Sequence, residues 1–217
     1  MICENVAFYL CQILDVPYVN YKIGILQGAK SNALVSICRP MIDHNQEFIP
    51  AYQVLTQKSD KITNTVNDYY LYLSILEEQN VPNAKEYLQK MIILEFIMAN
   101  EDRHLGNFGV IRDVESLQWV AICPIFDTGR SLNNKYWLDE IVDMRFFTNH
   151  FVNSETVKQF IDYPINDMGI KKLYQVPIYF KKLLNKYIDE LPLKEDDIAI
   201  LVQAFKQRIA LLENINK

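Results

Sequence analysis

The chain has 217 residues, of which 50% are hydrophobic and 23% charged, and its formal net charge is -5. This composition excludes wholesale disorder, and the length suits one domain or two small lobes that share a core. The acidic balance argues against a surface for nucleic acid. No apolar run reaches the roughly 20 residues of a membrane-spanning helix. We therefore expect neither nucleic acid nor a membrane as a direct partner.

The cysteine pattern predicts free thiols. Cys3, Cys11, Cys38 and Cys123 form no C-x-x-C pair, and no histidine stands at zinc-finger spacing from them. Free thiols are typical of a reducing cytoplasm. No Lys or Arg precedes Lys22, so the start lacks the basic region of a secretory signal. Together these features predict a cytoplasmic protein.

The first elements are predicted to be a helix and two strands. Apolar residues recur at helical spacing over residues 2–14, and the helix should end before Pro17. Residues 18–26 and 33–38 are rich in Val, Ile, Tyr and Leu, which indicates two strands, with a turn at Gly28.

The glycines of this hairpin have a spacing close to that of a P-loop. A P-loop has four residues between its two glycines, and its Lys directly follows the second one. Here Gly24 and Gly28 are separated by three residues, and Lys30 is displaced by one position. A strand follows where a P-loop requires a helix, so we interpret the segment as a hairpin turn.

The middle of the chain is predicted to be mostly helical. Residues 40–64 are polar and irregular, and residues 65–79 have apolar side chains at helical spacing. Asn83 and Glu86 form an N-x-x-E start signal, a variant of the capping box, for a helix that runs to about Ala99. The end of this helix, MIILEFIMA, is apolar on nearly all sides, which predicts a buried helix.

A polar loop and a hairpin are predicted next, over residues 100–107 and then 108–112 and 117–122. The chain after Asp127 is predicted to be helical, with Pro177 as the first residue of one helix that runs to Leu191. A last amphipathic helix is marked by Ile198, Leu201, Val202, Phe205, Ile209 and Leu212. A small sheet followed by helices with one inserted hairpin predicts an α+β fold.

The polar loop and the segment after the hairpin contain the candidate catalytic residues. Asp102 follows the buried helix, Asn107 comes five residues later, and Asp127 precedes Thr-Gly after the hairpin. Phosphoryl transfer needs one carboxylate that orients a hydroxyl nucleophile and accepts its proton, and oxygen ligands that hold Mg²⁺ on the nucleotide phosphates. Each residue alone is also a common cap or turn residue. Their combination, with a buried helix before and a hairpin between, favours a site at one end of the hairpin.

These motifs resemble a known family. The runs NEDRHLGNFGVIRD and PIFDTGRSL are similar to the catalytic and metal loops of HipA-like bacterial serine/threonine kinases, and a weaker resemblance covers ENVAFYLCQILDVPYVNY and the helical end. The resemblance implies a protein-kinase-like fold, with a remnant of the N-terminal lobe in residues 1–40 and a helical C-terminal lobe in residues 41–217. It places the hairpin beside the active site. The D-R-H-x-x-N element is also similar to that of phosphoinositide kinases.

The resemblance implies roles for the residues of the two loops. Asp102 would be the catalytic base, and Asn107 and Asp127 would bind the Mg²⁺ of Mg-ATP. His104 would belong to the same catalytic loop as a packing residue that shapes it. Arg103 would pair with an acidic neighbour or a phosphate.

The resemblance also implies roles for residues nearer the start. Glu4 would be the helix glutamate that pairs with a strand Lys. Ile37 and Cys38 end the second strand and would lead into the hinge, whose backbone holds the adenine of ATP. In kinases a Gly-rich loop and the strand Lys lie upstream of the glutamate, and only three residues precede Glu4 here. We therefore expect a partner chain or upstream sequence to supply both.

Three functional hypotheses follow. The first is ATP- and Mg²⁺-dependent phosphoryl transfer to a Ser or Thr of a protein, in a HipA-like kinase whose partners include an antitoxin or a chain that completes the N-terminal lobe. The second is a catalytically inactive kinase-like binding protein, which the missing loop and Lys favour. The third is a lipid or small-molecule kinase, suggested by the D-R-H-x-x-N element. The net charge of -5 argues against a lipid kinase, because such an enzyme usually approaches an anionic membrane through a basic surface.

Overall fold

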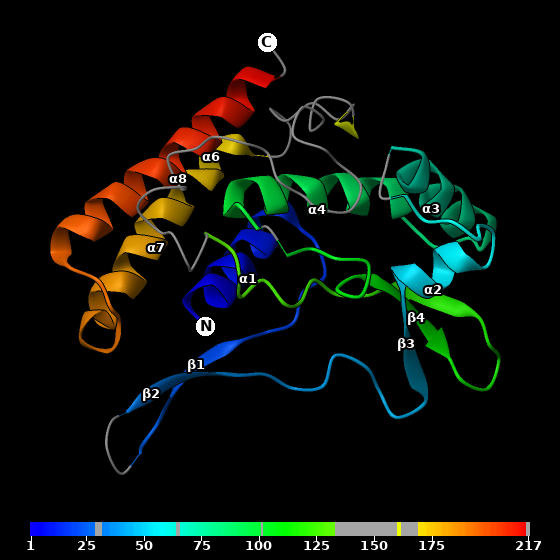
Figure 1. The fold of residues 1–217 in the computed structure, drawn as a ribbon, viewed down its shortest axis with the longest axis horizontal. Helices are drawn as coiled ribbons and strands as arrows, with labels where there is room; N and C mark the ends of the chain where they lie inside the picture. Colours follow the sequence, from blue (N-terminus) through cyan, green and yellow to red (C-terminus); the bar gives the residue numbers. More distant parts are fainter. Residues whose placement is uncertain (29–31, 64–65, 101, 133–159, 162–168, 216–217) are drawn as a thin grey trace.

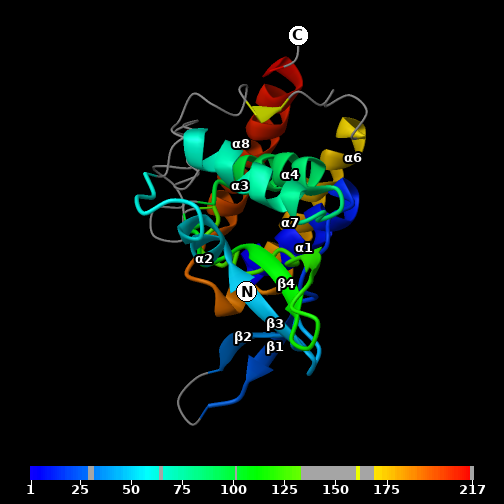
Figure 2. The same ribbon diagram turned by 90° about the vertical axis from the view of Figure 1, so that its right-hand side faces the viewer.

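The computed structural model describes residues 1–28, 32–63, 66–100, 102–132, 160–161 and 169–215 (Figure 1). It is an α+β structure in which helices surround a common core and two small sheets lie along one side (Figures 1 and 2). Residues 133–159, for which the sequence predicts helical structure, lie outside the described residues.

Helix α1 (Ile2–Leu14) confirms the first predicted element. Its buried face includes Val6, Leu10 and Leu14, spaced for one side of a helix. Asp15 ends the helix in the left-handed conformation, with φ of 52°, two residues before Pro17. The helix packs against the helices of the C-terminal half of the chain.

Strands β1 (Lys22–Leu26) and β2 (Ala33–Ile37) form an antiparallel pair, as the sequence predicts. Gly24 lies within β1, which confirms the hairpin interpretation over the P-loop. The predicted start of the first strand at residue 18 is four residues too early. Tyr18 instead forms an isolated parallel bridge with Ile125, because the backbone there bonds to the segment that leads to Asp127.

The segment 40–64 is more ordered than its polar composition predicts. It contains strand β3 (Gln46–Pro50) and helix α2 (Ala51–Thr56). β3 pairs with β4 (Gly109–Asp113), which pairs in turn with β5 (Trp119–Ile122), so β4 and β5 confirm the predicted hairpin. The missed strand exists because Gln46 finds its partner at Asp113, a pairing that local sequence does not reveal.

Helices α3 (Val66–Glu78) and α4 (Ala84–Met98) confirm the two helices predicted for the middle of the chain. α4 lies at the centre of the molecule and is buried along most of its length, as its apolar end predicts (Figure 1). The predicted capping box is not formed. Asn83 has a φ of 56° and makes no side-chain cap hydrogen bond, because it adopts the left-handed rather than the extended conformation of a box.

The C-terminal helices are α6 (Ile170–Leu173), α7 (Gln175–Lys186) and α8 (Glu195–Ile215), with a short 3₁₀ turn, η2 (Ile188–Glu190), before α8. Pro177 is therefore the third residue of its helix rather than the first, a position that still needs no backbone N–H donor. That helix also ends before the predicted Leu191. The six predicted core residues of the last helix are all buried.

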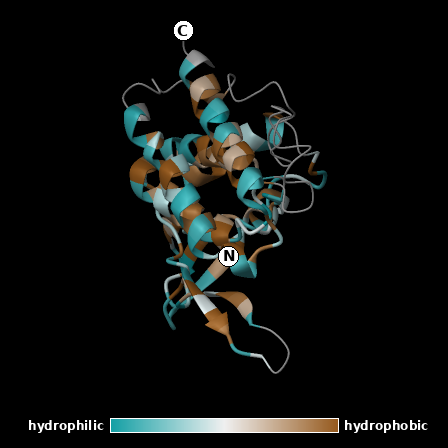
Figure 3. Cartoon of the chain, turned by 90° about the vertical axis from the view of Figure 1, so that its left-hand side faces the viewer, coloured by the Kyte–Doolittle hydropathy of each residue, from teal (hydrophilic) through white to brown (hydrophobic). Residues whose placement is uncertain are grey.

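The hydrophobic core lies between the helices, whose outer faces are hydrophilic (Figure 3). The β1–β2 ribbon projects from this body and carries exposed apolar side chains (Figures 1 and 3). All four cysteines are free thiols, and Cys38 is exposed while the others are buried. Within the described residues, no helix combines the length and apolarity that crossing a membrane requires.

Candidate active site

Asp102, the first candidate residue, lies in the loop that follows the end of α4. Ala99 ends the helix with a φ of 45°, and the backbone N–H of the buried Asn100 still donates to the Glu95 carbonyl over 3.0 Å. The Asn100 side-chain oxygen accepts the backbone N–H of Asp102 over 3.2 Å. Asn100 therefore ends the helix and fixes the start of the polar loop, which leaves the Asp102 side chain partly exposed.

Asn107 joins the two candidate loops. Its side-chain amide donates to the backbone carbonyl of Asp102 over 3.2 Å and to Oδ2 of Asp127 over 2.9 Å. Asn107 is buried and Asp127 is exposed, so the amide holds the carboxylate from the interior side of the loop. The structure thus brings together three residues that the sequence places 25 positions apart at most.

The second loop is held in place before and after Asp127. Ile125 exchanges backbone hydrogen bonds with Pro17 and Val19, at 2.8 and 2.9 Å. Beyond the site, the backbone N–H of Leu132 donates to the carbonyl of Met98 over 2.7 Å, at the end of α4. Asp127 itself has a φ of 52°, so its carboxylate sits on a tight turn between these two anchored segments.

Arg103 is buried and binds three parts of the chain. Its Nε donates to Glu95 Oε1 over 2.8 Å, and its Nη1 donates over 2.6 Å to the carbonyls of both Asn107 and Phe126. Burial raises the pKa of Glu95, and the Arg103 guanidinium opposes that shift. The pairing of Arg103 with an acidic neighbour is therefore confirmed, and the neighbour is Glu95.

His104 does not pack in the interior. Its side chain is exposed, and its Nδ1 accepts the backbone N–H of Gly106 over 3.1 Å. Its own carbonyl accepts the backbone N–H of Asn107 over 2.8 Å. His104 therefore shapes the loop through hydrogen bonds, because the tight turn leaves its ring on the outside. A catalytic role for this residue remains a prediction.

Glu4 lies at the edge of the site. The hydroxyl of Ser36, on β2, donates to Glu4 Oε2, and the Met1 amino group is 2.8 Å from the same oxygen. A Cβ added to Gly129 would lie 3.5 Å from Glu4 Oε1, which places the glutamate beside the turn that follows Asp127. The predicted pairing of Glu4 with a strand Lys remains a prediction.

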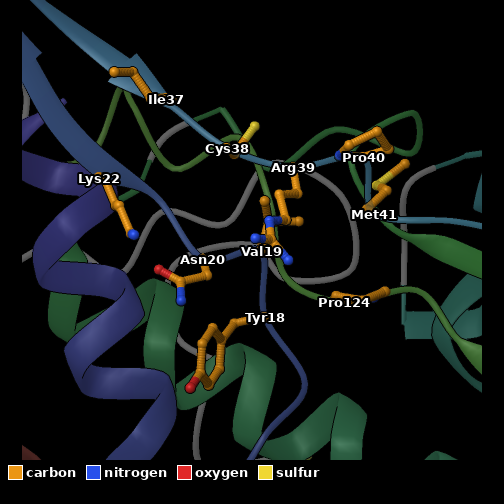
Figure 4. A pocket seen from close by; sticks show the side chains of 10 residues that line it. All are labelled: Tyr18, Val19, Asn20, Lys22, Ile37, Cys38, Arg39, Pro40, Met41 and Pro124. Carbon is orange, nitrogen blue, oxygen red and sulfur yellow. The ribbon is translucent and has the colours of Figure 1, made fainter.

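Ile37 and Cys38 lie apart from the three central residues. Both line a cavity of about 550 Å³ beside residues 37–41, and none of Asp102, Asn107 and Asp127 lines it (Figure 4). Both side chains are exposed. The predicted contact between the hinge backbone and adenine therefore stays a prediction.

Sequence reasoning missed three contributors, namely Glu95, Ser36 and Arg130. Arg130 Nη1 lies 3.5 Å from Asp102 Oδ2. Glu95 was detectable, because a single carboxylate within the apolar run MIILEFIMA must find a partner when it is buried. Ser36 and Arg130 have no comparable signal in the sequence.

Comparison with known proteins agrees with the overall fold. The chain is 26% identical over 150 residues to the serine/threonine-protein kinase CtkA of Helicobacter pylori, an alignment that covers 65% of this chain and 44% of CtkA. The solved structure of the H. pylori proinflammatory kinase CtkA superposes with a TM-score of 0.64 at 19% identity, over 98% of this chain and 85% of that one. The chain is a distant homologue of a bacterial serine/threonine kinase. The predicted kinase-like α+β fold is thus confirmed.

Two further findings complete the comparison. A chain of the Shewanella oneidensis MR-1 complex of HipA, HipB and operator DNA superposes with a TM-score of 0.49 at 15% identity, over 98% of this chain and 55% of that one. No family model matches the chain. The matched region spans less than half the length of curated CtkA.

Proposed function

We propose that the chain transfers the γ-phosphoryl group of ATP, with Mg²⁺, to a Ser or Thr hydroxyl of a protein. The observation that carries this proposal is the Asn107 amide, which bonds the Asp102 backbone and the Asp127 carboxylate at the same time. It unites the loop of the candidate base with both candidate metal ligands. The homology to CtkA, a serine/threonine-protein kinase by name, supports the class of acceptor.

The side chains fit Mg²⁺, which favours a few hard oxygen ligands and retains several waters. Within the described residues, Oδ1 of Asn107 and Oδ1 of Asp127 make no hydrogen bond, so both oxygens are available as ligands. The metal would neutralise charge on the ATP phosphates. Asp102 would orient the acceptor hydroxyl and take its proton, and the exposed Arg130 guanidinium beside it would attract phosphate oxygens.

The β1–β2 ribbon supports the proposed need for a further chain or segment. Two strands alone are marginally stable, and Ile25, Leu26 and Ile37 are 49%, 61% and 55% exposed. Additional strands would cover these side chains. They would also supply the Gly-rich loop and the Lys that would pair with Glu4. We propose that such strands come from a partner or from sequence outside residues 1–217, and an antitoxin is a further candidate partner.

The decisive experiment replaces Asp102 with Asn and measures phosphate incorporation from labelled ATP into a Ser/Thr-rich acceptor protein and into the chain itself. We expect transfer to fall about 10²–10⁴-fold, the usual contribution of a general base. The control is Asp60→Asn, which makes the same charge change at an exposed position. Unchanged transfer by Asp102→Asn, with an intact fold by circular dichroism, would refute the assignment.

A second candidate function is nucleotide binding without transfer, which the two-stranded ribbon favours. Titration of Mg-ATP into the wild-type chain by calorimetry separates the two functions. Binding that Asp127→Asn abolishes, without phosphate incorporation into any acceptor, would favour the binding protein. Binding together with incorporation supports the kinase.

A further inference from the structure

The cavity beside residues 37–41 lies on the face of the β1–β2 ribbon opposite the candidate active site. Lys22 and Ile37 are register partners and share one face, while Ser36 projects from the other face. Ser36 contacts Glu4, which lies beside the loop of Asp127. Because the cavity is lined by Lys22 and Ile37, it opens on the far side of the ribbon from these carboxylates.

The cavity has a positive lining in an acidic protein. Lys22 extends into it from the start of β1 and Arg39 from the segment after β2, with Asn20 between them (Figure 4). No acidic residue lines it, and within the described part of the chain neither cation forms an ion pair or a hydrogen bond. The two positive charges therefore remain available to a ligand. They form a local positive site in a chain whose formal net charge is -5.

The rest of the cavity lining is mostly apolar, and backbone hydrogen bonds hold part of it in place. Met41 and Pro124 lie on one side of the charged groups, and the Tyr18 ring points away from them toward the helices, where it packs against Phe8 at 4.7 Å between ring centroids (Figure 4). The backbone N–H of Val19 donates to the Ile125 carbonyl, and the Ile125 N–H donates to the Pro17 carbonyl, so both sides of Tyr18 are held in place. Met41 Sδ lies 3.7 Å from the Cys123 thiol. The volume of about 550 Å³ is within the range of small-molecule sites, which combine apolar walls with a few polar groups.

We infer that this cavity binds a small phosphomonoester with an apolar body. A phosphomonoester carries about -1.5 to -2 charges at neutral pH, which matches one Lys and one Arg. Arginine and lysine donate strong, charge-assisted hydrogen bonds to phosphate oxygens, and the apolar side chains of Met41 and Pro124 suit an apolar body attached to the phosphate. Pro124 is three residues from Asp127 in sequence, so an occupant would contact the segment that carries that carboxylate. The inference is independent of the proposed transfer reaction.

The test titrates phenyl phosphate into the full chain by calorimetry, without metal or nucleotide, and maps backbone amide shifts by NMR. We expect millimolar or tighter binding, with shifts at Asn20, Lys22 and Arg39. Arg39→Gln and Lys22→Gln should each weaken binding about tenfold or more. Lys181→Gln, an exposed lysine on α7, is the matched control and should change nothing.

Three outcomes overturn the inference. The first is no binding at about 10 mM phenyl phosphate. The second is binding whose shifts centre on Asp102, Asn107 and Asp127. The third is equal binding of inorganic phosphate or benzoate, which would remove the requirement for the apolar body or for the second negative charge.

Discussion

The Arg103 side chain sets the distance between the two loops of the candidate site. A single Nη1 group donates to the carbonyl of Asn107 and to that of Phe126, the residue before Asp127. The Nε group fixes the same guanidinium to Glu95 of the buried helix. The planar donors of arginine suit this arrangement, and lysine could not reproduce it. Arg103 is thus a positioning residue for both candidate Mg²⁺ ligands.

Replacing Arg103 with Met should strongly destabilise the fold. The Arg103 and Glu95 side chains are only 2% and 1% exposed, so the variant leaves a buried carboxylate without its partner. We expect a loss of about 3–5 kcal/mol in the free energy of unfolding, measured in urea. Arg112→Met is the matched control, because it breaks a partly exposed pair with Glu47 and should cost about 0–1 kcal/mol. Equal losses in the two variants would contradict this account.

The cysteines should differ sharply in reactivity. Burial raises the pKa of Cys3 and of Cys123 to about 12, and it also raises the pKa of Cys11, while Cys38 is exposed. Because the thiolate is the nucleophile, iodoacetamide at about pH 8 should label Cys38 first. Intact mass spectrometry should show one added group on the native chain and four in denaturant. Rapid native labelling of Cys38→Ser would contradict the assignment.

The same thiols give the fold a predicted alkaline limit. Their pKa values in the folded chain exceed the ordinary value of 9.0, so the unfolded chain loses these protons more readily. The stability that the buried thiols contribute is fully present below about pH 9 and is lost as the pH rises toward 12. Urea unfolding midpoints that stay constant between about pH 8.5 and 10.5 would argue against this effect.

Strand β3 is the element that local sequence analysis did not detect. The residues just before it, 43–45, are polar, and its stability comes from pairing with β4 far along the chain. Gly109 allows this approach. A Cβ at that position would lie 2.1 Å from the carbonyl oxygen of Ile49 and 2.9 Å from the Cα of Pro50. Backbone atoms at these distances cannot move aside as a flexible side chain does.

Gly109→Ala should therefore separate β3 from β4 and destabilise the chain by about 3 kcal/mol or more, the upper range of overpacking effects. Gly106→Ala is the comparison, because its new Cβ would meet the exposed His104 ring at 3.0 Å, and that ring can turn toward solvent. Thermal unfolding of the two variants measures the difference. The interpretation fails if Gly109→Ala unfolds at the same temperature as the wild type.

In the molecule as a whole, the start of the chain is packed into the C-terminal helices. The Tyr9 and Tyr179 rings lie 4.5 Å apart, and the Tyr179 hydroxyl donates to Asn5. α1 also packs against the central helix α4. The division at residue 40 that the sequence suggests stays a prediction, and these contacts indicate that α1 and the helical lobe share one core.

We expect one cooperative unfolding transition that includes α1. Leu10→Ala, at a fully buried position on α1, should cost about 2–5 kcal/mol and lower the stability of α8 by the same amount. Native-state hydrogen exchange measures both helices in one experiment. The expectation is contradicted if α1 exchanges at a lower free energy than α8, or if the substitution leaves α8 unaffected.

The sequence alone determined most of the long helices and the candidate chemistry, because both depend on local spacing. Periodic apolar residues identified α1, α3, α4 and α8, and the motif identified Asp102, Asn107 and Asp127. Only the tertiary structure decided which atoms meet. The bond from Asn107 to Asp127, the bond from Arg103 to Phe126 and the pairing of β3 with β4 all join residues distant in sequence. Such contacts depend on the packing of the whole chain, which no local pattern encodes.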